Sequence, residues 1–363
     1  MEQKQYPFYI KSTTILFGLI LIVYSLINLR DILIPIAFAI VIAVLLNPLT
    51  NRLVKLNFPR ILAIALSLLT AMLFFGGIIY FLSSQIANFS DTLPVLKEKF
   101  TQVLSEFQHW VEGKFGLTLT KQVQLINEAL NSSKSLIGST LGTALGTLGI
   151  IFLLPVYIFL FLFYKPLIVN FLYEVFAEEN SKHVSQILGQ TKSAIQSYMV
   201  GLLIEALVVA TLNSTALLIL DVKYAILLGV IGALLNMLPY IGGIIAITLP
   251  VLMATITKDG YSTQLGIVIA YVVIQFIDNN ILVPRIVSSK VQINALVSIL
   301  TVLLGGALWG IPGMFLSIPI VAVLKIIFDR VEGLKPWGKL LGDELPTKNM
   351  MQIWRRRKKA SAG

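Results

Sequence analysis

The sequence predicts an all-α, polytopic integral membrane protein with about eight membrane segments. Of its 363 residues, 56% are hydrophobic and only 13% are charged, whereas a soluble domain carries about 25% charged residues. The mean hydropathy is +0.86. Apolar runs long enough to cross a bilayer recur along the chain. Two of them, residues 224–257 and 295–328, are over-long and broken by proline and glycine.

The composition also excludes several classes of function. The chain has no cysteine, so disulfides and thiolate chemistry are excluded. His109 and His183 begin no metal-ligand motif, so we expect no metal site. The chain shows no Walker, HExxH or GxSxG motif, so we expect neither an enzyme nor an ATP-driven pump. We expect no cofactor beyond a coupling H⁺ or Na⁺.

The first 82 residues predict three transmembrane helices, over residues 15–29, 32–49 and 61–82. The loop after the second helix carries Arg52, Lys55 and Arg60, and positive charge in a short loop marks the cytoplasmic side. The C-terminal tail, residues 331–363, is also basic. We therefore expect a multi-pass protein of the bacterial inner membrane with both termini in the cytoplasm. The net charge of +10 is a topology signal, and we expect no nucleic-acid partner.

Residues 83–135 predict a polar extracytoplasmic insert, which is amphipathic and helical. A fourth transmembrane helix is expected over residues 136–164. It carries Gly138, Gly142 and Gly146 on one face, a spacing that lets membrane helices approach closely. The contact is either within one subunit or between subunits of a homo-oligomer.

Residues 165–195 predict a cytoplasmic amphipathic linker, and residues 196–330 a transport core. The first span of the core, residues 196–220, contains Glu205 and Asn213. An ionisable group at membrane depth costs roughly 2.5–3.5 kcal/mol and is a functional candidate by default. Glu205 either binds a coupling ion or forms a structural hydrogen bond with a neighbouring helix.

The two broken runs hold the proline and glycine residues expected to act as hinges. Such interrupted segments in corresponding positions are typical of repeat-built secondary transporters. Each run either turns back as a re-entrant hairpin or crosses as one kinked span, and both solutions leave the tail in the cytoplasm. The hairpins are favoured because they also place Arg285 and Lys290 on the cytoplasmic side. The candidate hinges in the two runs are Pro239, Gly242, Gly243, Pro250, Pro312, Gly313 and Pro319, and Pro284 between the runs is a further one.

A polar cluster lies between the two broken runs. It comprises Gln275, Asp278, Asn279, Asn280 and Arg285. The side-chain oxygens of its first four members could bind a small cation or a polar solute. The alternative is a helix end at which Asp278 pairs with Arg285. We expect this cluster to meet both breaks, with Asn236, near mid-membrane and to form the binding site.

Four stretches resemble the autoinducer-2 exporter family of bacterial permeases. They are ILIPIAFAIVIAVLLNPLTNRL, LLGVIGALLNMLPYIGG, FIDNNILVPRIVSSKVQINALVSIL and GGALWGIPGMFLSIPIVAVLK. The chain departs from many members at Val283, where they carry an acidic residue. The resemblance implies secondary active transport, a homo-oligomer, and export of the quorum-sensing signal autoinducer-2 or, in some members, sodium/proton antiport.

Three functions therefore compete. The first is a secondary transporter that exports a small polar solute, such as autoinducer-2, coupled to H⁺ or Na⁺. The alternative is a Na⁺(Li⁺)/H⁺ antiporter. The third is a channel or a non-transporting membrane scaffold. The expected partners are the lipid bilayer, a small polar solute and further copies of the chain.

Overall fold

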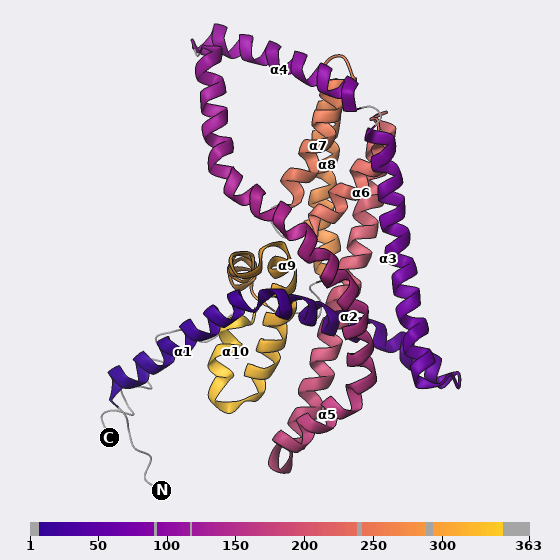
Figure 1. Ribbon diagram of the computed structural model, residues 1–363, viewed down its shortest axis with the longest axis vertical. Coiled ribbons are helices and arrows are strands. Elements are labelled where there is room, and N and C mark those ends of the chain that lie inside the picture. The colour runs from indigo at the N-terminus through magenta and orange to yellow at the C-terminus, as the bar shows by residue number, and fades with distance from the viewer. Residues whose placement is uncertain (1–6, 91–92, 117, 238–241, 288–292, 344–363) are drawn as a thin grey trace.

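The structure is a computed structural model that describes residues 7–90, 93–116, 118–237, 242–287 and 293–343. Within these ranges every regular element is a helix (Figure 1). Seven of the helices described there are long and apolar enough to cross a membrane, and two shorter apolar helices accompany them. The all-α, polytopic prediction is confirmed. Pro239 and the basic tail beyond residue 343 lie outside the described residues.

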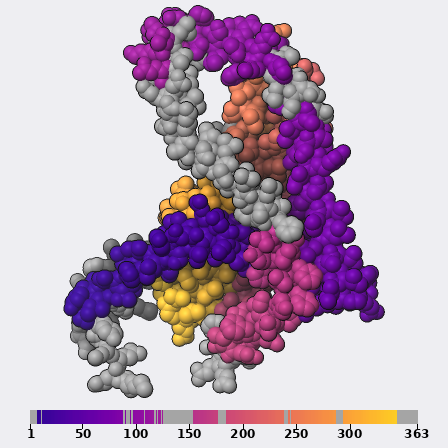
Figure 2. All heavy atoms as spheres, viewed as in Figure 1, coloured from indigo at the N-terminus to yellow at the C-terminus, as the bar shows by residue number. Residues whose placement is uncertain are grey.

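The first three helices are α1 (Phe8–Asn28), α2 (Arg30–Lys55) and α3 (Arg60–Ser90). Helix α1 extends away from the body of the molecule (Figure 2). Its end is tied to the body because Trp309 Nε1 donates a 2.9 Å hydrogen bond to the Leu26 carbonyl. Helix α2 lies centrally, against α3, α5 and α9. Its buried Ala39 and Ala43 let neighbouring helices approach closely.

The outer faces of these helices carry large apolar side chains. Leu73 and Tyr80 of α3, for example, are 68% and 78% exposed. A contiguous apolar surface of this kind marks a membrane or protein interaction site. In a bilayer these side chains contact lipid tails, which are as apolar as leucine. The exposed faces are therefore those of a membrane protein.

Helix α4 (Leu93–Phe115) lies at one end of the molecule, beyond the ends of α3 and α7 (Figure 1). Helix α5 (Leu119–Ile219) follows and reverses direction within its length. Lys165 donates a hydrogen bond to Asn47 Oδ1, and Gln196 donates one to the Val44 carbonyl. Val44 and Asn47 lie one turn apart on α2. A straight helix from Lys165 to Gln196 would be about 46 Å long, so α5 must fold back between them. The reversal is visible at the label α5 in Figure 1.

Helices α6 (Ala225–Asn236) and α7 (Gly242–Thr257) form a hairpin. Their 12 and 16 residues correspond to about 18 and 24 Å, so neither arm alone reaches across a hydrocarbon core of about 30 Å. A Cβ at Gly242 would collide with the Leu235 carbonyl, so this tight reversal requires glycine.

Both ends of the α6–α7 hairpin lie at the same end of the molecule. Lys258, after α7, donates a hydrogen bond to the carboxylate of Asp221, before α6. That hydrogen bond and the positive charge of Lys258 hold the pKa of Asp221 below its ordinary value. Beside this turn, Tyr224 packs edge-on against Phe89 of α3, with ring centroids 5.3 Å apart.

Helix α8 (Ser262–Ile277) continues directly into a π-helix, η1 (Asp278–Val287). The apolar residues 265–283 predict one ordinary span, and the π-helix at its end is a difference from that prediction. Pro284 has no N–H and cannot support a regular α-helical ladder here. Wide turns of this type are rare and are frequent at functional sites. The widening begins at Asp278.

Helix α9 (Ala295–Arg330) is a second hairpin, folded at Gly310. Gly310 has φ 64° and ψ −144°, a conformation open essentially to glycine alone. Beyond it the backbones of the two arms are in contact. A Cβ at Gly313 would collide with the Gly305 carbonyl, so glycine is required there. The turn η3 (Glu332–Leu334) and the short helix α10 (Lys335–Leu341) follow.

Asn294 joins the two ends of the α9 hairpin. Its Nδ2 donates hydrogen bonds to the carbonyls of Leu340 (2.7 Å) and Gly342 (3.0 Å). Its Oδ1 accepts from the Val297 amide at 2.9 Å, which caps the first turn of α9. The chain thus enters and leaves this hairpin at one end of the molecule, as it does at α6–α7.

Candidate functional site

A small enclosed cavity lies where α5, the α6–α7 hairpin, α8 and η1 meet. The centre of a water molecule can occupy about 10 Å³ of it, so it has room for about one water molecule or one bare cation. Its lining mixes apolar side chains with amide, hydroxyl and carboxyl groups. The lining residues are Val209, Asn213, Gly232, Asn236, Ala246, Tyr271, Ile274, Gln275 and Asp278.

Asp278, at the junction of α8 and η1, is the charged residue of this lining and is only 2% exposed. Asn236 Nδ2, at the end of α6, donates a 2.8 Å hydrogen bond to Asp278 Oδ2. Gln275 Nε2 donates to the same oxygen at 3.4 Å. Both donors therefore serve one carboxyl oxygen and link the hairpin to α8.

Three other oxygens of the lining are buried without a hydrogen-bond partner among the described residues. They are Asp278 Oδ1, Asn213 Oδ1 and the Tyr271 hydroxyl. Asn213 and Tyr271 are 2% and 7% exposed, so water outside the protein does not reach them. An unsatisfied buried polar group costs about 1–3 kcal/mol. A water molecule, an ion or a polar group in the cavity would satisfy all three.

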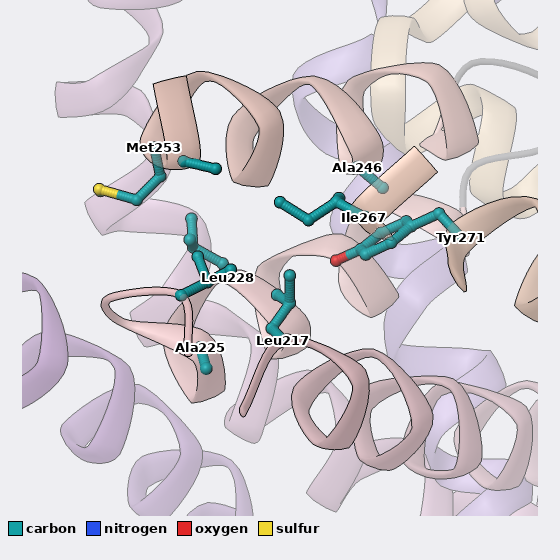
Figure 3. Packing of buried hydrophobic residues seen from close by; sticks show 9 residues of the cluster. Leu217, Ala225, Leu228, Ala246, Met253, Ile267 and Tyr271 are labelled. Atoms are coloured by element: carbon teal, nitrogen blue, oxygen red, sulfur yellow. The ribbon is translucent and has the colours of Figure 1, made fainter. Parts of the chain in front are cut away.

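The absence of a side chain at Gly232 leaves space for the ends of the Asn213 and Tyr271 side chains. A Cβ on Gly232 would lie 3.3 Å from Asn213 Nδ2, 3.5 Å from the Ala246 methyl and 3.6 Å from the Tyr271 hydroxyl. The side-chain ends of Asn213 and Tyr271 thus converge on one point beside α6. In Figure 3 the Tyr271 hydroxyl points inward from α8 on the side of Ala246 and Leu217.

Glu205 lies on the same face of α5 as Asn213, two turns earlier, and is 6% exposed. It does not line the cavity, but it lies within electrostatic range of Asp278. None of the ion pairs among the described residues involves Glu205 or Asp278. Two buried carboxyls without a cationic side chain call for protons or a bound cation.

The structure does not bring the rest of the predicted polar cluster to the cavity. Asn279 and Asn280 are exposed, and they bond to Gln275 and to the Phe276 carbonyl. Arg285 is also exposed. The alternative in which Asp278 pairs with Arg285 was wrong, because the Asp278 carboxylate is turned toward Asn236 instead.

The predicted hinges fall at structurally distinct places. Gly242 forms the hairpin reversal, and a Cβ on Gly243 would approach Gln275 Oε1 to 3.0 Å. Pro250 is fully buried inside α7. Pro312, Gly313 and Pro319 lie in the second arm of α9, and Pro284 lies in η1. Gly138, Gly142 and Gly146 lie within α5, but their surroundings are outside the described side chains, so their packing role stays a prediction.

Tyr271 escaped the sequence analysis, and Gly310 was among the residues that break the second run but not among the candidate hinges. Tyr271 stands in an apolar helix, yet it shares one face with Gln275 and Asp278 at spacings of four and seven, a signal that could have identified it. Gly310, not Pro312 or Gly313, carries the positive φ of the second reversal. In a run with several glycines, nothing in the sequence singles it out.

The chemistry of the cavity favours a small, hard cation or a proton. Its unpartnered atoms are all oxygens, one of them a carboxylate, which are the ligands that hard cations prefer. Groups of three or more His, Cys, Asp or Glu that could hold a metal were not found in the described part of the chain. The site therefore suits a weakly and reversibly bound ion better than a structural metal.

Comparison with known proteins agrees with this membrane architecture. Residues 15–333 match the family model described as "AI-2E family transporter". The Escherichia coli (strain K12) "AI-2 transport protein TqsA" is 24% identical over 332 residues, which covers 91% of this chain and 95% of that protein. A Bacillus subtilis (strain 168) protein, YrrI, named as a candidate transport protein, is 27% identical over 317 residues, which covers 82% of this chain and 86% of that protein.

The family match covers most of α1, all of α2 and α3, both hairpins and every residue that lines the cavity. It confirms the resemblance on which the sequence analysis relied. The chain is a multi-span membrane protein and belongs to the AI-2E family of transporters.

Proposed function

We propose that this protein is a secondary active transporter of the bacterial inner membrane that moves a small polar solute, driven by H⁺ or Na⁺ bound in the cavity at Asp278. One observation carries the proposal. Three buried oxygens without partners, including a carboxylate oxygen, face a space the size of one cation. A passive structural cavity would be lined by apolar groups or by satisfied polar ones.

The two hairpins give the protein its moving parts. Each hairpin starts and ends at one end of the molecule, and in each the two arms touch at a glycine. Neither arm of α6–α7 is long enough to span. We infer that both are re-entrant, α6–α7 from outside and α9 from the cytoplasm. Non-helical backbone at membrane depth is tolerated where protein or a water-filled cavity surrounds it. Ion binding at Asp278, which Asn236 joins to the first hairpin, would then fix the position of that hairpin against α8.

The solute is proposed from the relatives. TqsA is named for autoinducer-2 transport, and a signal of that kind is small and polar. The cavity is too small for such a molecule in this conformation. Solute passage therefore requires the hairpins to separate, which is the alternating access expected of such transporters.

The test is solute flux in proteoliposomes with imposed H⁺ or Na⁺ gradients. We expect autoinducer-2 or a related polar solute to accumulate only when a gradient is applied. Glu205→Gln should weaken the dependence on the gradient, because the second buried carboxyl near Asp278 is lost. Flux that ignores the gradient in both forms would contradict coupling. Single-channel currents would instead favour a channel.

The Na⁺(Li⁺)/H⁺ antiporter is the second candidate, and the size of the cavity favours it. A site for one cation with two carboxyls nearby is sufficient for exchange of a cation against protons. Proteoliposomes without any organic solute discriminate the two. Na⁺-driven proton movement, followed with a pH-sensitive dye, would support the antiporter. A requirement for the solute would support the permease.

A further inference from the structure

Three cationic side chains gather at the opposite end of the bundle from the Asp221–Lys258 pair, away from the cavity. Arg60 begins α3, Lys165 lies on the first arm of the α5 hairpin, and Lys192 lies on its second arm. They are close enough for Lys192 and Arg60 both to act on Lys165 electrostatically. Figure 2 shows this end of α3, in violet, against the pink spheres of α5.

The hydrogen bonds of this region explain why the cations converge. Lys165 Nζ donates to Asn47 Oδ1 at 3.0 Å. Gln196 Nε2 donates to the Val44 carbonyl at 2.7 Å, and Lys192 lies one turn before Gln196 on the same face. Both arms of α5 therefore present a lysine beside the same turn of α2.

Arg60 completes the cluster from the side of α3. Its Nη2 donates a 2.9 Å hydrogen bond to the Leu162 carbonyl, and its guanidinium lies 5.8 Å from the Phe163 ring centroid. A guanidinium has five N–H groups, so donors remain for another acceptor. Leu162 is one turn from Lys165, which places the two cations side by side.

No acidic side chain balances this charge within the described part of the chain. None of the ion pairs there includes Arg60, Lys165 or Lys192. Like charges held together repel, and an anion with several acceptor oxygens relieves the repulsion. Positively charged pockets between helices at the membrane surface are known to suit lipid phosphates.

The surface beside the cluster is apolar and exposed. Ile61 is 56% exposed, and Tyr164 and Leu167 are 46% and 65% exposed. A free phosphate ion would leave this apolar surface uncovered, whereas the acyl chains of a phospholipid would cover it. The combination of unpaired cations and adjacent apolar side chains thus matches both parts of a lipid.

We propose that Arg60, Lys165 and Lys192 form a binding site for the phosphate headgroup of an anionic phospholipid between α2, α3 and the α5 hairpin. The bound lipid would hold the two arms of α5 against α2 and would stabilise the bundle. The site is separate from the cavity at Asp278 and stands whether or not the proposed transport is correct.

The test is native mass spectrometry of the full-length protein in detergent, titrated with phosphatidylglycerol or with phosphatidylcholine. We expect the wild type to retain phosphatidylglycerol at least tenfold more tightly. The double variant Arg60→Gln/Lys192→Gln should lose this preference. The matched control, Arg52→Gln/Lys55→Gln, removes the same charge from the exposed end of α2 and should keep it. Lys192→Arg should also keep it.

Thermal unfolding supplies the second measurement. Phosphatidylglycerol should raise the unfolding temperature of the wild type and of the control, but not that of Lys192→Gln. Lys192 is exposed, so its replacement should not impair folding. Stabilisation by inorganic phosphate alone, without a preference between the lipids, would overturn the lipid assignment in favour of a free anion. Equal retention of both lipids by the wild type would overturn the site itself.

Discussion

At the scale of single residues, the account depends on oxygens that are buried without a partner. Tyr271 is the clearest case, because its ring packs in the core while its hydroxyl faces the cavity unbonded. Asn213 Oδ1 and Asp278 Oδ1 share that situation. A group that lowers stability in the empty protein is retained where it contributes to binding. Stability and binding should therefore respond in opposite directions when it is removed.

Tyr271→Phe tests this opposition. Without added cation we expect the variant to be as stable as the wild type or more stable, by up to about 1–3 kcal/mol, because an unsatisfied hydroxyl is removed. Stabilisation by Na⁺ should fall several-fold. The control is Tyr261→Phe, at an 84% exposed tyrosine in the turn before α8. A variant that loses stability but keeps its full response to Na⁺ would argue for a purely structural tyrosine.

Asn236→Ala tests the link between the hairpin and α8. The variant loses the 2.8 Å hydrogen bond to Asp278. We expect a destabilisation of about 0.5–2 kcal/mol, because hydrogen bonds between membrane helices, and hydrogen bonds to a charged group, contribute amounts of this order. Thermal unfolding in detergent measures it. Asn279→Ala is the matched control, since Asn279 is exposed and away from the cavity. If both substitutions destabilised the protein equally, the hydrogen bond from Asn236 to Asp278 would have no special role in the site.

At the scale of elements, the two hairpins depend on glycines at which backbones touch. Gly242 abuts the Leu235 carbonyl in the first hairpin, and Gly313 abuts the Gly305 carbonyl in the second. A methyl group at either place meets backbone atoms, which cannot rotate away. Other helical glycines have open space around them, as Gly77 of α3 does. The same substitution should therefore have opposite effects in the two settings.

Gly313→Ala should destabilise the protein by roughly 1–3 kcal/mol, as overpacking does. Gly77→Ala should be neutral or stabilising by up to about 1 kcal/mol, since alanine favours the helix and meets no neighbour. Thermal unfolding followed by tryptophan fluorescence compares them directly. The hairpin geometry of α9 would be contradicted if Gly313→Ala were as well tolerated as Gly77→Ala.

At the scale of the whole molecule, the hairpins decide the topology. Lys258 beside Asp221, and Asn294 beside Gly342, place the ends of each hairpin together. Since the chain contains no cysteine, single introduced cysteines report their side of the membrane without background. Lys223→Cys and Asp259→Cys should both react with an impermeant maleimide from outside intact cells. Lys55→Cys and Lys339→Cys should react only after lysis. Opposite sides for positions 223 and 259 would mean that α6–α7 crosses as one kinked span.

Much of this architecture could be predicted because membrane segments follow from length and hydropathy. The broken runs and the candidates Asn213, Asn236 and Asp278 were visible as polar or helix-breaking residues in apolar surroundings. The partner of Asp278 was not, because the sequence suggested Arg285 as its pairing partner, whereas the fold places Asn236 at 2.8 Å. A reversal between the spans 136–164 and 196–220 was expected, but the sequence did not show that both arms of α5 bond to the same turn of α2, because tertiary contacts establish that.

The most direct test of the account is accumulation of solute in proteoliposomes by an Asp278→Asn variant. Asparagine keeps the shape and can still accept the hydrogen bond from Asn236, but it carries no charge for a coupling ion. Asp259→Asn, at an exposed turn, is the matched control. The account predicts that Asp278→Asn loses gradient-driven accumulation at least tenfold while Asp259→Asn retains it. Accumulation by Asp278→Asn at the level of the wild type, under the same H⁺ or Na⁺ gradient, would contradict it.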